Sequence, residues 1–133
     1  MVVFTIDFKT MSKKIFLCDD NLVILEALEL ILSMTDATVI SESNSSLVLD
    51  MIINEKPDMF ICDLHMPGTN GGDLIRQIRM HKEFNGLFIL CISASYNGRD
   101  IALNAGANDF LPKPFEIHEL LSVVNQVLMS GTG

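Results

Sequence analysis

Short apolar runs alternate with amphipathic segments along the chain, and this alternation predicts its architecture. The run LFILCI is apolar at every position, which is typical of a parallel strand covered by helices on both faces. Four other apolar runs have strand length and are bounded by polar or turn-forming residues. Strands are therefore expected at residues 14–18, 38–41, 58–62, 87–92 and 109–111.

Apolar residues recur at helical spacing between and after these runs, which predicts helices. In residues 21–36, Leu25 and Leu28 share one face while Glu26 and Glu29 lie on the other. N-cap candidates at residues 43–46 precede a second helix. Its inward face is expected to hold Leu47, Val48, Met51 and Ile52.

Three further helices are expected later in the chain. One should follow the pair Gly71 and Gly72, and a short one should occupy residues 98–105. The last, residues 116–129, carries an apolar face made by Ile117, Leu120, Leu121, Val124 and Leu128. Because strands and helices alternate, crossover connections must join parallel strands. The pattern therefore predicts an α/β fold, a doubly wound five-stranded parallel sheet with helices on both faces.

Composition narrows the class of protein. The 133 residues are 49% hydrophobic and carry a net charge of −8, which disfavours binding to nucleic acid or to anionic lipid. Glu26 and Glu29 interrupt the longest apolar stretch, so we expect no membrane span. Residues 1–12 are interpreted as an N-terminal extension or a cloning remnant, 13–129 as the domain and 130–133 as a flexible tail. We see no secretion signal and expect a cytoplasmic protein.

The three cysteines, Cys18, Cys62 and Cys91, all fall inside strand-like runs. They lack the CxxC spacing of common zinc sites, and their number is odd. We therefore interpret them as buried free thiols in a reducing compartment.

Polar residues collect where the predicted strands end. Asp19 and Asp20 follow the first strand, Asp63 the third, Ser93 the fourth and Lys113 the fifth. Each alone could be a turn residue, a helix cap or a solvated tip. In a parallel α/β sheet, however, these ends meet at one edge, which is where ligands bind.

Three neighbouring carboxylates repel one another unless a cation compensates them. Mg2+ is suited to a few carboxylates, waters and phosphate oxygens. A cation, a lysine, a hydroxyl and a free carboxylate together suit phosphoryl transfer, and the carboxylate can itself be the nucleophile.

With these motifs in place, the chain resembles the receiver domains of two-component response regulators, the CheY-like fold. The resemblance covers residues 13–129 and is carried by FLCDDN (16–21), ICDLHMPGTNG (61–71), ISA (92–94), AGANDF (105–110) and LPKPF (111–115). It implies the flavodoxin-like strand order 2-1-3-4-5. It also implies a phosphorylation switch that is not an enzyme in the ordinary sense, with only self-phosphorylation and slow autodephosphorylation.

Residue by residue, the resemblance implies that Asp63 accepts the phosphoryl group. Asp19, Asp20, Asp63 and the backbone carbonyl of His65 would hold Mg2+, or Mn2+ in its place. Lys113 would contact Asp63 and then a phosphoryl oxygen, and its bond to Pro114 is expected to be cis. Ser93 would be the switch hydroxyl, and Phe110 occupies the position of the aromatic residue that moves inward with it.

The resemblance also implies partners. The phosphoryl donor would be a sensor histidine kinase or a histidine phosphotransfer protein. A homodimer could form through the face made by the fourth helix, fifth strand and fifth helix.

Three features of the sequence depart from the family pattern. His65 is an unusual occupant of a position that affects dephosphorylation, and we expect it to be a solvent-exposed residue partnered by Ser95. The interval from Ser93 to Lys113 is about two residues shorter than in relatives, which should shorten the fourth helix. Phe110 lacks a phenol hydroxyl, so it can act only through packing.

Three other functions use a similar fold or a similar set of residues. A phosphatase of the haloacid dehalogenase type would carry a second Asp where this chain has His65. A flavodoxin-like cofactor binder would need a phosphate-binding loop where this chain has acidic residues. The remaining alternative is a degenerate receiver that acts as a docking module without phosphorylation.

Overall fold

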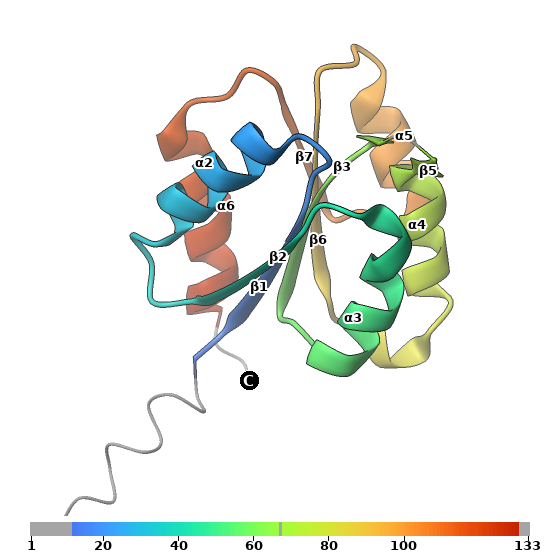
Figure 1. The fold of residues 1–133 in the computed structure, drawn as a ribbon, viewed down its shortest axis with the longest axis horizontal. Helices are drawn as coiled ribbons and strands as arrows, with labels where there is room; N and C mark the ends of the chain where they lie inside the picture. The colour runs from blue at the N-terminus through green and yellow to red at the C-terminus, as the bar shows by residue number, and fades with distance from the viewer. Residues whose placement is uncertain (1–11, 67, 131–133) are drawn as a thin grey trace, which may run out of the picture.

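The computed structural model describes residues 12–66 and 68–130, which fold around a central parallel sheet (Figure 1). Its strands are β1 (Lys14–Cys18), β2 (Thr38–Glu42), β3 (Met59–Asp63), β6 (Phe88–Ser93) and β7 (Asp109–Pro112). They are arranged in the order β2-β1-β3-β6-β7 and all pair in parallel. Counted along the sheet alone this is 2-1-3-4-5, the order of CheY and flavodoxin, so the predicted fold is confirmed.

Helices cover both faces of the sheet (Figure 1). On one side are α2 (Leu22–Leu32) and α6 (Ile117–Met129). On the other are α3 (Val48–Glu55), α4 (Gly71–Arg79) and α5 (Gly98–Ala105). Two short 3-10 helices, η1 (Ser45–Leu47) and η2 (Lys82–Phe84), precede α3 and β6.

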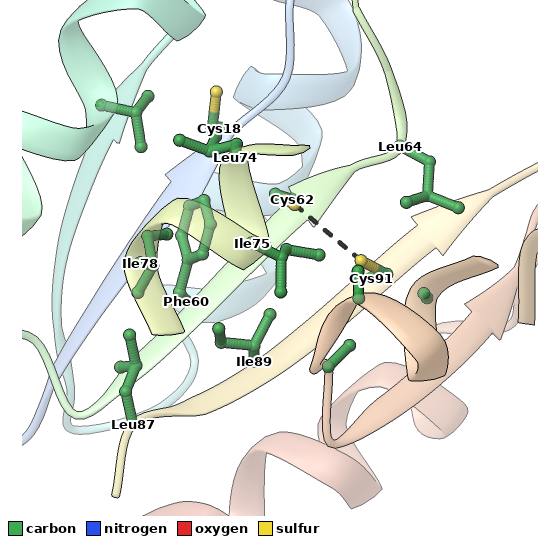
Figure 2. Close-up of a cluster of buried hydrophobic side chains, with 14 of the residues drawn as sticks. Cys18, Phe60, Cys62, Leu64, Leu74, Ile75, Ile78, Leu87, Ile89 and Cys91 are labelled. Atoms are coloured by element: carbon green, nitrogen blue, oxygen red, sulfur yellow. Dashed lines mark hydrogen bonds between the residues drawn. The ribbon is translucent and has the colours of Figure 1, made fainter. Parts of the chain in front are cut away.

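The alternation of side chains along each strand builds two hydrophobic clusters. Phe16 and Phe60 point toward α3, α4 and α5, while Ile15 and Leu17 point toward α2 and α6. Figure 2 shows the first cluster, in which α4 contributes Leu74, Ile75 and Ile78. Within the described residues every buried side-chain nitrogen or oxygen has a hydrogen-bond partner. No helix in the described part of the chain is long and apolar enough to cross a membrane.

The structure corrects two expectations about the helices, one about where the first helix ends and one about which side chains face inward. The first helix stops at Leu32, not near residue 36, because Ser33 and Thr35 turn their hydroxyls back onto the carbonyls of Leu30 and Leu32. Leu47, expected to face inward, is 47% exposed. It lies in η1, whose tighter winding ahead of α3 displaces it from the inward stripe.

Two further differences concern the segment after Asp63. Gly71 and Gly72 are the first residues of α4 and do not precede it, since the Asn70 side chain caps the helix by accepting the Gly72 N–H at 2.7 Å. A small antiparallel pair, β4 (His65–Met66) with β5 (Thr69–Asn70), was not predicted. Two-residue strands are too short to leave a periodic pattern.

Candidate functional site

Three carboxylates meet at the carboxyl edge of the sheet. Cys18 of β1 lies in register with Cys62 of β3, so the residues that follow them, Asp19 and Asp63, reach the same level of the edge. Together with Asp20, each offers one carboxylate oxygen, and these oxygens lie within 4.8 Å of one another. Oxygen ligands gathered this closely fit a divalent cation of the Mg2+ type.

Lys113 joins the cluster from the end of β7. Its Nζ lies 2.9 Å from Oδ2 of Asp63 and 3.4 Å from Oδ2 of Asp19. The Lys113–Pro114 peptide bond is cis, as expected. The side chains of Lys113, Asp19 and Asp63 are 19%, 4% and 12% exposed, so these ion pairs are only weakly screened by solvent.

Burial and charge act in opposite directions on the pKa values of this cluster. Burial raises the pKa of Asp19, although the backbone N–H of Asn21 and the charge of Lys113 lower it in part. Burial alone would lower the pKa of Lys113, but hydrogen bonding to Asp63 and the charges of Asp19 and Asp63 raise it overall. The lysine is therefore firmly protonated, and its ammonium group provides the local positive charge for the carboxylates.

Asp63 presents both carboxylate oxygens to defined donors. Oδ2 accepts from Lys113, and Oδ1 accepts the backbone N–H of His65 at 3.0 Å. The His65 backbone therefore turns toward the cluster immediately after Asp63. The His65 ring projects outward and its Nε2 bonds with Oγ of Ser95, the partner expected from the sequence.

Ser93 and Phe110 lie beside the carboxylates. Ser93 ends β6 and is fully buried, and its hydroxyl accepts the backbone N–H of Ser95 at 3.2 Å. Its carbonyl accepts the backbone N–H of Lys113 at 2.9 Å, which ties the two strand ends together. Phe110, on neighbouring β7, is only 6% exposed and points inward. All the residues singled out at the strand ends are thus brought to one edge.

Two supporting residues were not predicted from the sequence. Asn21 caps α2 directly after the acidic pair, accepting from the backbone N–H groups of Val23 and Ile24. Gly71 brings α4 against the chain that leaves β3, where a Cβ would lie 2.5 Å from the Asp63 carbonyl oxygen. The Asn21 cap has a sequence signal, since Asn directly before an apolar helical pattern is a common N-cap, whereas the role of Gly71 depends on a close approach that only the fold reveals.

Comparison with known proteins identifies the family. The family model described as the response regulator receiver domain matches residues 15–125. The chain belongs to this family. It is therefore a CheY-like receiver domain of two-component signalling, and such domains are signalling modules rather than ordinary enzymes.

Individual receiver-domain relatives agree with this assignment. The response regulator MprA of Mycobacterium tuberculosis is 34% identical over 118 residues, which cover 89% of this chain and 51% of MprA. The chain thus spans about half the length of the curated relatives it matches.

Two solved structures have a fold similar to that of this chain. A protein from Chloroflexus aurantiacus, solved as a candidate response regulator, is 32% identical with a TM-score of 0.83, and the match covers 88% of this chain and 98% of that one. The receiver domain of the sensor histidine kinase PA1611 from Pseudomonas aeruginosa is 25% identical with a TM-score of 0.81, covering 90% and 99%. That structure is described with a magnesium ion coordinated in its active-site cleft.

Proposed function

We propose that this receiver domain accepts a phosphoryl group on Asp63 and acts as a phosphorylation switch. The observation that carries the proposal is the placement of Asp63. Its carboxylate closes β3 at the sheet edge, where one oxygen is held by Lys113 and the other by the His65 N–H. A carboxylate fixed in this way is oriented for attack before the phosphoryl donor arrives.

In the proposed reaction, an Asp63 oxygen attacks the phosphorus of a phosphorylated histidine. The new P–O bond forms as the P–N bond breaks, and the imidazole nitrogen of the donor retains the electron pair. Lys113 moves from Asp63 to an oxygen of the transferred group, where its charge neutralises the developing negative charge. The Ser93 hydroxyl donates to another of these oxygens.

Asp19, Asp20, Asp63 and the backbone carbonyl of His65 are the groups proposed to hold Mg2+, or Mn2+. Their fit rests on the carboxylate oxygens within 4.8 Å of one another. When bound, the ion supplies positive charge for the carboxylates and for the phosphoryl oxygens. Asp20 is exposed, so its carboxylate can bind an ion without giving up an existing ion pair in the described structure.

The proposed donor is a sensor histidine kinase or a histidine phosphotransfer protein in the cytoplasm. The signal would leave through α5, β7 and α6, because the Phe110 ring lies against Gly98 of α5, Ser93 pairs with Pro112 of β7, and α6 follows β7 along the chain. The same face is proposed for homodimer formation, and it exposes the apolar side chains of Leu103 and Ile117.

The acceptor assignment can be tested by labelling. Acetyl phosphate with Mg2+ should yield one acid-labile phosphoryl group per chain, detected by phosphate-affinity electrophoresis and intact mass. Asp63→Asn should abolish the label because an amide is a poor nucleophile. Asp73→Asn is the matched control, since Asp73 lies on the exposed surface of α4 paired with Arg76, and it should retain the label. Undiminished labelling of Asp63→Asn would show that the acceptor is elsewhere.

The metal assignment needs a binding measurement. Asp20→Ala should weaken Mg2+ binding on the order of tenfold, as expected when a charged ligand is lost. Isothermal titration calorimetry, or the Mg2+-dependent rise in Tm, gives the affinity. Asp36→Ala removes an exposed carboxylate away from the cluster and should leave the affinity unchanged. Equal affinities for Asp20→Ala and the wild type would exclude Asp20 as a ligand.

A further inference from the structure

The Phe110 ring occupies a notch that exists only because residue 98 is glycine. Phe110 lies in β7, opposite Cys91 of β6, and its ring extends toward the first turn of α5. A Cβ placed on Gly98 would lie 2.8 Å from both Cε1 and Cζ of that ring, and 3.4 Å from Cβ of Ser93. Carbon atoms do not approach to 2.8 Å without a shift, so any side chain at residue 98 would compete with the ring for this space.

Arg99 covers the notch from the solvent side. Its guanidinium carbon lies 5.5 Å from the centroid of the Phe110 ring, within the range of a cation–π contact. One guanidinium N–H also points to the Phe110 carbonyl oxygen at 3.5 Å, a long and weak contact. Gly98 thus leaves room for the ring, and the contact with Arg99 stabilises the ring in this position.

We propose that Gly98 and Arg99 are positioning residues that hold Phe110 inward before any phosphoryl group is added. An aromatic residue can report phosphorylation by moving only if it populates an outward position beforehand. Here the inward position already has a shaped notch and a cation above it. Phosphorylation would then act mainly on Ser93, whose Cβ borders the same notch. The importance of this arrangement for signalling rests on the proposed function, but the ring position does not.

The experiment follows the exposure of one ring. 4-Fluorophenylalanine is introduced at residue 110 alone, and the 19F solvent-isotope shift between H2O and D2O measures contact with water. Without phosphorylation, the wild type should show a buried ring, and adding fluoroberyllate with Mg2+ should change the shift little. Gly98→Ala should show an exposed ring under the same conditions, because rotating the ring outward relieves the clash more easily than moving the backbone.

Matched variants separate positioning from general destabilisation. A Cβ on Gly86 meets nothing within 4 Å, so Gly86→Ala should leave the 19F signal unchanged. Arg99→Gln should raise the ratio of outward to inward rings roughly two- to five-fold, the range for an exposed cation–π contact. Arg99→Lys, which retains the cation, should restore most of the inward population. Tm values for all variants show whether each remains folded.

Defined outcomes overturn the proposal. It fails if the unphosphorylated wild type shows an exposed ring that fluoroberyllate buries, or if Gly98→Ala leaves the ring buried in a folded protein. It also fails if Arg99→Gln and Arg99→Lys both match the wild type. If the wild type takes up no phosphoryl label on Asp63, the proposed function is wrong. The ring measurements made without fluoroberyllate do not depend on that result.

Discussion

Asp19, a proposed metal ligand, illustrates how a single buried carboxylate can oppose folding. Its carboxylate is buried close to Asp63, and burial raises its pKa despite the hydrogen bond from Asn21 and the charge of Lys113. A folded-state pKa above the unfolded value means that the folded protein binds this proton more tightly. The contribution of Asp19 to stability is therefore lost as pH rises from the unfolded value, near 3.8, through the raised folded value.

Asp19→Asn should therefore stabilise the metal-free protein. At pH 7 in EDTA we expect the free energy of unfolding to rise by about 1 kcal/mol, since an amide can still accept the Asn21 N–H without a buried charge. The fall in stability with increasing pH should also become flatter in the acid range. Urea denaturation at a series of pH values measures both effects, with the exposed substitution Asp36→Asn as control.

Mg2+ should reverse this order, because the proposed metal site keeps all three carboxylates only in the wild type, and tighter binding to the folded protein adds more stability. Lower stability of Asp19→Asn in EDTA would show instead that the contact with Lys113 outweighs burial of the charge.

At the scale of elements, the junction between β3 and α4 shows how a helix start fixes the site. A Cβ at Gly71 would lie 2.5 Å from the Asp63 carbonyl oxygen and 2.7 Å from Cα of Leu64. Both atoms belong to the backbone, so neither can move aside as a side chain could. The Gly71 N–H also donates to the Leu64 carbonyl at 2.9 Å, which holds the start of α4 against the end of β3.

Gly71→Ala should therefore destabilise the protein by roughly 1–3 kcal/mol, the usual range for overpacking. Alanine is the better helix former by about 1 kcal/mol, so a net loss would show that the close approach dominates. Urea denaturation gives the change in free energy, and labelling by acetyl phosphate should slow because the backbone around Asp63 shifts. Gly86→Ala, which has open space, should change neither quantity. Equal stability of Gly71→Ala and the wild type would mean that the junction adjusts freely.

The same junction shows how far sequence could predict this fold and site. The apolar runs predict the strands, and the carboxyl ends of parallel strands lie at one edge of the sheet. These two points were enough to place Asp19, Asp63 and Lys113 together. Gly71 was visible as a glycine, but its contact with the Asp63 carbonyl depends on how α4 packs. The Gly98 notch was not predicted for the same reason, since periodicity records which face is apolar and not how closely two backbones approach.

At the scale of the whole molecule, the three cysteines lie in one row across the centre of the sheet. Cys18, Cys62 and Cys91 pair in register on β1, β3 and β6, and all face the cluster beneath α3, α4 and α5. Figure 2 shows Cys62 and Cys91 pointing toward one another. Their sulfur atoms are 3.9 Å apart. Burial raises the pKa of Cys18 to about 12. The pKa of Cys62 is also raised, first by the hydrogen bond with Cys91 and second by burial.

These thiols should therefore report global unfolding. At pH 8 we expect all three to react with 5,5′-dithiobis(2-nitrobenzoic acid) at least about a hundredfold more slowly in the native protein than in guanidinium, because all three side chains are buried and the reagent reaches them only when the core opens. Absorbance at the wavelength of the released thiolate follows the reaction. Ser46→Cys, at an exposed position before α3, should add one fast-reacting thiol and serves as the internal control.

Gly71→Ala gives a quantitative check, because where opening is a rapid equilibrium the rate follows the unfolded population. Each 1.4 kcal/mol lost by that variant should then speed the reaction of all three thiols about tenfold. Rapid reaction of a single cysteine in the native wild type would contradict this, and would show that one edge of the sheet opens independently of the rest.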